Sequence, residues 1–214
     1  MDYPKELVDQ AKKELAGHQL EGFLSGQGPK NAVLMLIGEA PGKTEVDTNV
    51  PFSGRAGKKL DGWLKIAGLN RSDIYITSAV RSRPFHIKKQ PNRNGTLEIK
   101  YPNRTPTQKE VTAFAPLLDF EIETIQPKIL VPMGNIGLQR LLGKNYSISA
   151  YHGKSLYLPI FHFDNTRQKL IETPNPYPLF PLYHPAAVFY NQSLEQTIQE
   201  DWLKLAEFIQ NDRV

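Results

Sequence analysis

Apolar residues occur along the chain in two patterns, as short continuous runs and as longer stretches with helical spacing. The short runs are bounded by turn-forming residues and predict buried strands at 33–37, 74–77, 129–131 and 179–183. In the longer stretches an apolar residue recurs every three or four positions. This spacing predicts helices over 3–16, 56–67 and 135–142.

Two further helices have explicit start signals. Thr107-Gln108-Lys109-Glu110 is a capping box, and the helix that begins there ends before Pro127. Its apolar stripe consists of Val111, Phe114, Leu118, Ile122 and Ile125. A second cap at Ser193 begins the final helix. The side chains expected to face inward from that helix are Leu194, Ile198, Trp202, Leu205 and Ile209.

Strands alternate with helices, which predicts an α/β protein with a largely parallel, four-stranded sheet and helices on both faces. We expect a single domain over 1–214, with a core at about 30–190, a leading helix and a C-terminal helix. Ligands bind such sheets outside the carboxyl ends of the strands. The tripeptides at those ends are Gly38-Glu39-Ala40, Ser78-Ala79-Val80, Met133-Gly134-Asn135 and His184-Pro185-Ala186.

The composition is that of a globular protein, with 214 residues of which 40% are hydrophobic and 22% charged. The absence of cysteine excludes disulfides, thiol catalysis and cysteine-ligated zinc or iron–sulfur clusters. The five histidines show no metal-ligand spacing, so we expect neither a metal nor a cofactor. No apolar run approaches the ~20 residues that span a bilayer, and the N-terminus lacks the apolar segment of a secretory signal. We therefore expect a cytoplasmic monomer without a membrane partner.

Charge is distributed unevenly along the chain, whose net charge is +4. Residues 81–104 contain seven Lys and Arg against Glu98 alone, whereas residues 195–214 carry a net charge of −3. This predicts a basic face and an acidic tail helix. The basic segment is either a footprint for a phosphate backbone or a solvated loop. Prolines punctuate 84–106, which predicts a long loop or a small hairpin.

The segment from 34 to 57 carries the most chemistry. Glu39 lies in a tight turn after the first strand, and a second turn presents Phe52 just before a helix. A carboxylate beside an aromatic ring suits a flat polar ligand, which favours a nucleobase site. The segment also looks like a phosphate-binding loop. However, three residues separate Gly38 from Gly42 where that motif needs four, and no Asp follows the third strand to hold magnesium.

An ordered set of motifs resembles the uracil-DNA glycosylase superfamily, especially its family 4. The motifs run through about residues 33–190 and lie at 38–42, 51–57, 81–84, 103–106 with Glu110, 126–134 and 183–187. Each motif alone is weak, but the ordered set is specific. The resemblance implies a three-layer α/β/α sandwich. It also implies a DNA glycosylase that flips a base out of the duplex and hydrolyses its N-glycosidic bond.

The resemblance implies roles for individual residues. His184 is expected to donate a hydrogen bond to uracil O2, and Glu39 to position water or stabilise the cationic sugar. Phe52 is expected to stack on the base, and Gly42 stands where other families block the thymine methyl. The implied site is completed by Gly38, Ala40 and Ser78 around the base and by Arg55, Arg83, Pro185 and Ala186 on the DNA.

Each of these residues also has an ordinary structural explanation. His184 can be a histidine satisfied at a strand end, and Glu39 a carboxylate that accepts hydrogen bonds from turn N–H groups. Phe52 can be a core aromatic and Gly42 a plain turn glycine. Solvated surface charge explains the arginines equally well.

Two departures from the family pattern change the picture. Family 4 binds an iron–sulfur cluster through four cysteines, and Ser82 stands where one of them is expected. The cluster is therefore lost, and we expect the 84–106 segment to replace its packing. Ser78 stands where the family places an asparagine that reads the uracil edge. A hydroxyl is shorter than an amide, so Asn135 is a candidate compensating amide.

Three functions are compatible with these observations. The first is a cofactor-free glycosylase that acts on uracil or another damaged base in single- or double-stranded DNA. The second is a non-catalytic or altered-specificity nucleic-acid-binding member of the same superfamily, which Ser78 favours. The third is a hydrolase of free nucleobase compounds or nucleosides. Release of base from DNA, or from free nucleosides, distinguishes them.

Overall fold

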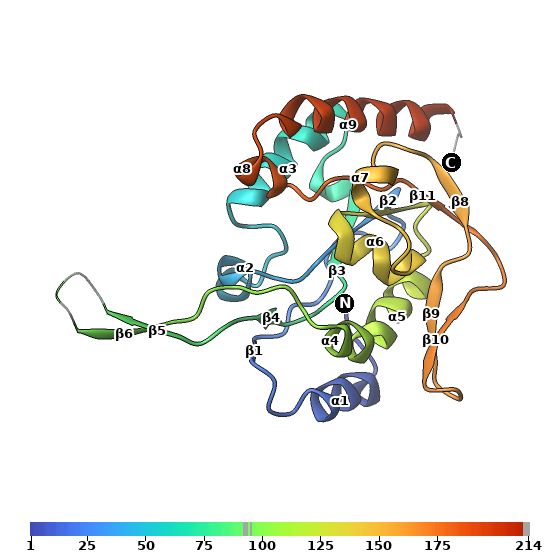
Figure 1. The fold of residues 1–214 in the computed structure, drawn as a ribbon. Coiled ribbons are helices and arrows are strands. Elements are labelled where there is room, and N and C mark those ends of the chain that lie inside the picture. The colour runs from blue at the N-terminus through green and yellow to red at the C-terminus, as the bar shows by residue number, and fades with distance from the viewer. Residues whose placement is uncertain (92–93, 95, 212–214) are drawn as a thin grey trace.

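The fold is built on a central sheet (Figure 1). A computed structural model describes residues 1–91, 94 and 96–211 of the chain. The strand order is β3-β2-β7-β11-β8, and all neighbouring pairs are parallel except β11 with β8. The strands are β2 (Leu34–Gly38), β3 (Ile74–Ser78), β7 (Ile129–Pro132), β8 (Leu156–Leu158) and β11 (Tyr177–Leu179).

Two helices cover one face of the sheet. They are α3 (Arg55–Ile66) and α9 (Leu194–Asn211), which lie together above the sheet in Figure 1. Leu36 and Val131 point to this face and pack in one cluster with Trp63 of α3 and Trp202 of α9. The apolar stripes that predict these helices are thus the stripes that they bury.

The opposite face is covered by α5 (Ala115–Ile125) and α6 (Gly134–Leu142). Met35 and Leu130 face them, because side chains alternate between the two sides of a strand. A third cluster joins α1 (Lys5–Glu14) to α4 (Gln108–Ala113) at one end of the molecule. The predicted sandwich of a parallel sheet between two helical layers is confirmed.

The structure differs from the expected elements in three places. The sheet has a fifth strand, the antiparallel edge strand β8. The helix expected to run from the capping box at Thr107 to Ile125 is two helices that meet at Phe114. Pro116 in the first turn of α5 has no N–H to continue the earlier helix. Three short helices were also not predicted, namely α2 (Lys43–Thr48), α7 (Ile148–Tyr151) and α8 (Ala187–Tyr190).

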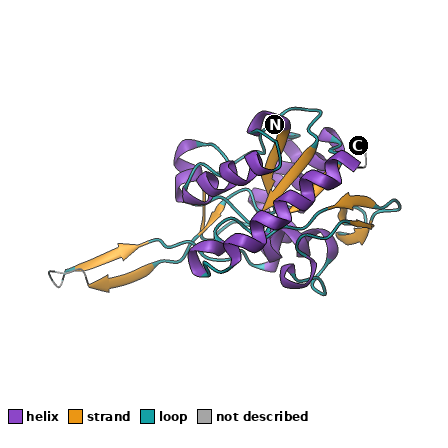
Figure 2. Ribbon diagram, turned by 90° about the horizontal axis from the view of Figure 1, so that it is seen from above, coloured by secondary structure: helices purple, strands orange, loops and turns teal. Residues whose placement is uncertain are grey.

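Two hairpins leave this sandwich in different ways (Figure 2). One is formed by β9 (Phe161–Asp164) and β10 (Lys169–Glu172), and its first strand packs on α5. The other is formed by β5 (Lys88–Pro91) and β6 (Leu97–Lys100), and all eight of these strand residues are exposed. We call these two strands, together with residues 85–87 and 101–103 that lead into and out of them, the arm. The remaining elements are β1 (Leu20–Glu21), β4 (Arg83–Pro84) and a short 3₁₀ helix, Arg71–Asp73.

The arm, which makes up much of the 84–106 segment, projects away from the core, so this part of the segment does not supply the expected packing. The third cluster lies beside buried Ser82 instead and consists of α1 and α4 residues together with Val80 and Leu117. Glu110 of α4 joins it to the chain before β1, since its carboxylate contacts His18 at 2.9 Å and Arg104 at 2.6 Å. Apolar packing and this ion pair, which includes Arg104 of the 84–106 segment, hold α1, α4 and the chain before β1 together.

The predicted basic face is narrower than the charge count implies. Arg81 is fully buried and pairs with Glu121 at 2.7 Å. Arg83 is 4% exposed, and Arg104 is turned toward Glu110. Three of the seven basic residues of 81–104 are thus structural, and among the described residues the exposed charge of this segment lies on the arm lysines.

Candidate active site

The carboxyl ends of the parallel strands meet at one cavity of about 1020 Å³. Glu39 follows β2, Ser78 ends β3, Asn135 follows β7 and His184 follows β11, and all four line it. The main-chain hydrogen bonds of β11 continue past its end, with Leu182 N–H donating to Pro132 at 3.0 Å. This extension carries His184 to the same edge as Glu39. The predicted convergence of these four strand ends is therefore present.

Glu39 brings a carboxylate into the cavity without a partner. Its backbone is fixed, because Val80 N–H donates to the Glu39 carbonyl at 3.1 Å. Its side chain is partly buried, and within the described residues it accepts no hydrogen bond. Burial raises the pKa of Glu39 above its ordinary value. The alternative explanation, in which Glu39 accepts hydrogen bonds from turn N–H groups, does not hold among the described residues, because another carboxylate accepts them.

That carboxylate is Glu45 on α2, which the motifs did not single out. Its two oxygens accept from Gly42 N–H at 3.1 Å and from Gly54 N–H at 3.0 Å. It thereby joins the turn after β2 to the turn before α3. A Cβ on Gly42 would lie 2.7 Å from Glu45 Oε2, so glycine is needed for this contact. A Glu three residues after a helix cap is the capping-box position, which is the signal in the sequence.

Phe52 is held in an unfavourable backbone conformation. Its φ of 51° is uncommon for a residue with a large side chain. Arg71 holds the turn, with its guanidinium donating to the Pro51 carbonyl at 2.8 Å and to the Phe52 carbonyl at 2.6 Å. The Phe52 ring lies over the end of β2, where a Cβ on Gly38 would be 3.1 Å away. Its centroid is 5.5 Å from that of the His184 ring.

His184 is neutral at pH 7, and its tautomer is fixed. Desolvation lowers the pKa of His184 to about 4, against an opposing effect of the Glu45 charge. Ala186 N–H donates to His184 Nδ1 at 3.2 Å. Because Nδ1 is the acceptor, the single proton of the neutral ring is on Nε2. Nε2–H is therefore a hydrogen-bond donor, and the bond from Ala186 N–H fixes the orientation of the ring that carries it.

Ser78 and Asn135 supply opposite hydrogen-bonding groups to the cavity. The Ser78 hydroxyl donates to the Val80 carbonyl at 2.8 Å, so its proton is used and its oxygen is left as an acceptor. The Asn135 side-chain oxygen accepts from Ile148 N–H at 2.8 Å. This bond fixes the amide orientation and leaves the NH₂ group as the donor. An acceptor and a donor thus face one cavity from two strand ends.

Comparisons with known proteins identify the family. The model of the Uracil DNA glycosylase superfamily matches residues 25–206. The chain belongs to this superfamily. It is 35% identical over 208 residues to a Type-4 uracil-DNA glycosylase of Sulfurisphaera tokodaii, covering 95% of this chain and 82% of the relative. A Type-4 enzyme of Saccharolobus solfataricus is 34% identical over 187 residues, covering 85% and 74%. One of Thermotoga maritima is 31% identical over 190 residues, covering 87% and 83%.

Of the four residues expected to contact DNA, two line the cavity and two are buried. Arg55 is exposed, lines the cavity and stacks its guanidinium 4.6 Å from the Phe189 ring centroid. Ala186 lines the cavity as well, whereas Pro185 is buried. Arg83 donates to Asn103 Oδ1 at 2.6 Å, to Glu21 and to the Tyr101 carbonyl. Burial and these three bonds remove Arg83 from our candidate phosphate contacts.

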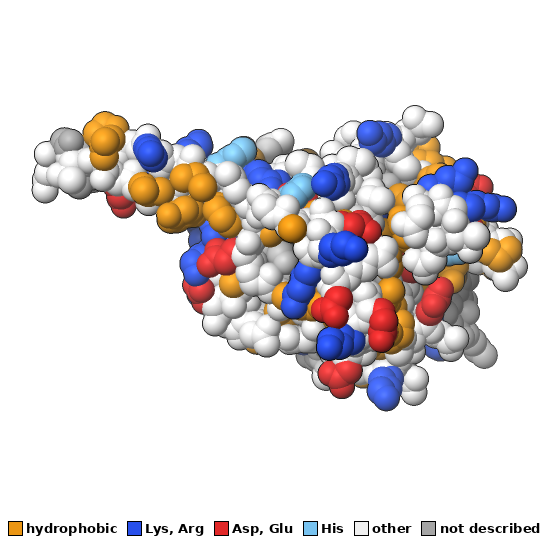
Figure 3. Space-filling model, turned by 90° about the horizontal axis from the view of Figure 1, so that it is seen from below, with side chains coloured by type: hydrophobic (Ala, Val, Ile, Leu, Met, Phe, Trp, Pro, Cys, Tyr) orange, Lys and Arg blue, Asp and Glu red, His pale blue; other side chains and the backbone are white. Residues whose placement is uncertain are grey.

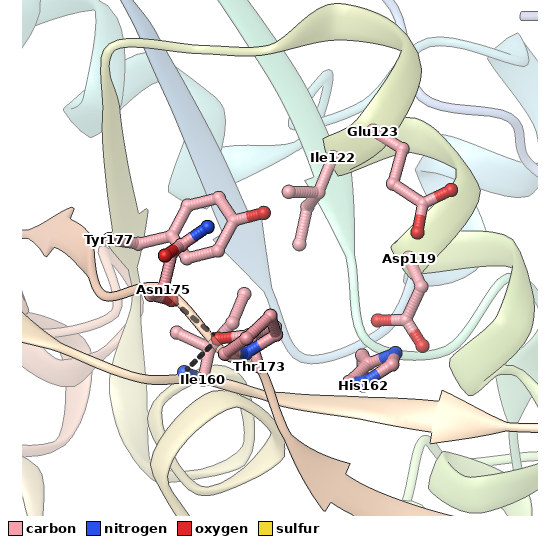
Figure 4. A pocket seen from close by; sticks show the side chains of 9 residues that line it. Asp119, Ile122, Glu123, Ile160, His162, Thr173, Asn175 and Tyr177 are labelled. Atoms are coloured by element: carbon pink, nitrogen blue, oxygen red, sulfur yellow. Dashed lines mark hydrogen bonds between the residues drawn. The ribbon is translucent and has the colours of Figure 1, made fainter.

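A second, smaller cavity of about 180 Å³ lies away from this edge (Figure 4). The side chains of Asp119, Glu123 and His162 gather at one side of it. Asp119 is already bound, because Arg140 donates to one oxygen and Phe163 N–H to the other at 2.8 Å. In the described part of the chain no group of three His, Asp or Glu side chains is arranged to hold a metal ion. This cavity contains none of the predicted residues.

No helix of the described residues is long and apolar enough to cross a membrane.

Proposed function

We propose that this protein is a DNA glycosylase that hydrolyses the N-glycosidic bond of uracil, or of another deaminated or damaged base, in DNA. The observation that carries the proposal is the meeting of Glu39, Phe52 and His184 around one cavity. These residues give a carboxylate, a stacking surface and a neutral donor. Membership of the superfamily supports the same reaction class.

His184 acts on the leaving group. Breaking the bond between C1′ and the base nitrogen leaves negative charge on the base, much of it on O2. The Nε2–H of a neutral imidazole donates to that oxygen and stabilises the anion. A histidine with a pKa of about 4 stays in this form across the physiological pH range.

Glu39 acts on the sugar. As the base leaves, C1′ gains oxocarbenium character, and a nearby carboxylate stabilises this positive charge. Water then bonds to C1′, and its proton is transferred so that the products are an abasic sugar and a neutral base. The absence of a hydrogen-bond partner for Glu39, among the described residues, leaves its oxygens available for the sugar or for that water.

Ser78 and Asn135 read the base edge in this proposal. Uracil presents an N3–H donor and an O4 acceptor, which match the Ser78 oxygen and the Asn135 NH₂ group. Two residues would then do what one asparagine does in the family. Phe52 stacks on the ring, Gly38 and Ala40 shape the wall behind it, and Gly42 keeps Glu45 in place.

The DNA is bound at the rim of the cavity. The exposed guanidinium of Arg55 is suited to a phosphate, and Ala186 lies next to His184 on the loop that leads into α8. The target nucleotide must be flipped out of the stack to reach the cavity. We propose that the enzyme works as a monomer in the cytoplasm.

A panel assay tests the proposal. Purified protein is incubated with oligonucleotides that each carry uracil, hypoxanthine, xanthine or an oxidised pyrimidine, and alkali then reveals abasic sites. We expect abasic sites in at least the uracil strand and no strand cleavage before alkali. Salt-sensitive DNA binding without any base release, even at excess protein, would show a binding protein instead. Release from free nucleosides without DNA affinity would show a nucleoside hydrolase.

A further inference from the structure

The arm grows out of the rim of the cavity. Pro84 and the residues from Asn103 to Thr105 line the cavity, and the chain runs from them into β5 and out of β6. A bridge between Phe85 and Asn103 closes the base of the arm. Figures 1 and 3 show the arm projecting well beyond the sandwich. A ligand that extends out of the cavity on this side therefore passes beside this hairpin.

Two arginines fix the base of the arm. Arg83 binds the carbonyl of Tyr101 and the side chains of Asn103 and Glu21. Arg104 binds the Phe85 carbonyl at 3.2 Å and the Glu110 carboxylate at 2.8 and 2.6 Å. The arm is thus held to the walls of the cavity rather than attached by a free loop.

One face of the arm is cationic. Lys88 and Lys100 are directly opposite in the register, and like charges at such positions destabilise a sheet. Glu98, the one acidic residue of β5 and β6, lies 3.4 Å from Lys100. A second anion on this face would relieve the remaining repulsion. A phosphate is the anion that a site on the rim of a nucleic-acid cavity meets.

The other face of the arm is exposed and largely apolar, with Lys89 as its charged residue among the described positions. The register places Lys89 opposite Ile99 and Pro91 opposite Leu97, and it continues to the bridge at Phe85. Ile87, Leu97, Ile99 and Tyr101 are exposed by 51%, 73%, 49% and 50%. Hydrophobic and basic side chains lie side by side along the arm in Figure 3. A two-stranded hairpin with apolar side chains in water is marginally stable, so such a surface indicates a partner.

We propose that the arm lies in a groove of duplex DNA beside the flipped nucleotide, with Lys88 and Lys100 on the phosphates and the apolar face against the sugars and base edges. A two-stranded ribbon fits a DNA groove. From Phe85 to Pro91 the arm extends about 20 Å at ~3.3 Å per residue. That length spans about six base pairs at 3.4 Å each. The inference rests on the proposed function, because it takes DNA as the occupant of the cavity.

The test compares binding to two uracil-containing duplexes. One has about 25 base pairs, and the other has about 9, which is too short to follow the arm to its end. The arm variant is Lys88→Gln/Lys100→Gln. The matched control is Lys128→Gln/Lys169→Gln, which removes two exposed positive charges far from the arm. Lys128 lies at the amino-terminal end of β7, opposite the end that forms the cavity, and Lys169 lies on β10. Melting temperatures of both variants verify the fold.

We expect the arm variant to bind the long duplex roughly tenfold more weakly than wild type, with a log–log salt slope smaller by about 2. Its loss on the short duplex should be at most half as large on a logarithmic scale, and the control should match wild type. Equal losses for arm variant and control, or equal losses on both duplexes, would overturn the inference.

A second variant tests the apolar face. Leu97→Gln/Ile99→Thr keeps the lysines and should also weaken binding to the long duplex. Wild-type affinity in this variant would point to a protein partner and would contradict the DNA groove. These results are distinct from a failure of the proposed function, which is read separately as base release by the wild-type protein from the short duplex.

Discussion

The cavity and the arm differ in how they hold their polar groups. In the cavity, Glu39 and His184 are desolvated and have shifted pKa values, and Phe52 is kept in a strained conformation. On the arm, lysines and large apolar side chains stand in water. This difference in solvation indicates that the cavity residues serve catalysis and the arm residues serve DNA binding. Desolvated groups stabilise charges in a transition state, whereas exposed lysines contribute affinity that salt screens.

The largest effect should follow from removing the donor of the cavity. His184→Ala should lower the single-turnover rate of uracil release by about 10²–10³-fold, the usual loss for one such donor. DNA affinity should change little, because His184 acts on the base as it leaves. Quench assays and binding titrations measure the two quantities. His162→Ala at the smaller cavity is the control, and an unchanged rate for His184→Ala would remove it from the mechanism.

Glu39→Gln should lose about 10²-fold in rate while it gains stability at pH 7. The pKa of Glu39 is raised, so the folded state binds its proton more tightly than the unfolded chain does. Stability from this group is therefore lost as pH rises through the folded pKa, and glutamine removes that loss. In wild type the rate should fall on acidification with an apparent pKa above the ordinary value for Glu.

Thermal melts at pH 7 and pH–rate profiles test both parts. Glu123→Gln, an exposed residue of α5, is the control. A Glu39→Gln protein that is less stable than wild type at pH 7 would show that the carboxylate is structurally bound.

A smaller effect is expected at the base edge. Asn135→Ala should reduce uracil excision by about tenfold, since a bidentate reading of a base edge contributes ~1–3 kcal/mol. In a Ser78→Asn background, where one amide supplies donor and acceptor, the same substitution should cost less. Excision rates of the two single variants and the double variant form a double-mutant cycle, with Asn175→Ala as control. An equal loss of rate in both backgrounds would show that Asn135 does not contact the base edge.

The smallest effect should be on stability at the arm. Leu97→Ala should change the free energy of unfolding by less than about 0.5 kcal/mol, because the side chain is already exposed. Leu36→Ala in β2 should cost about 2–5 kcal/mol, because it leaves a cavity in the core. Urea denaturation measures both. A large loss of unfolding free energy in Leu97→Ala would show that the arm packs as part of the folded core and does not differ from the cavity region in burial.

Strand ends and helix faces could be predicted because their signals are local. The apolar run before Gly38 specifies a buried strand. The separate apolar stripes that contain Trp63 in α3 and Trp202 in α9 specify helices and the faces that they bury. The motif order was enough to bring Glu39 and His184 to one edge. In contrast, Glu45 also binds Gly54 N–H and Arg71 binds the Phe52 carbonyl, and these contacts between turns have no local signature. Only the contact of Glu45 with Gly42 N–H has one, the capping-box spacing. The prediction that Arg83 contacts DNA did not anticipate its burial, because the sequence does not show which partners a buried guanidinium binds.

We conclude that this cysteine-free chain excises uracil with its own cavity residues. Mass spectrometry of the free uracil that excess protein releases from a single-uracil oligonucleotide in the presence of EDTA tests this conclusion. We expect one uracil per strand and an intact abasic strand with wild type, and a rate lower by about 10²–10³-fold with His184→Ala. No free uracil from wild type, or equal release by both proteins, would contradict it.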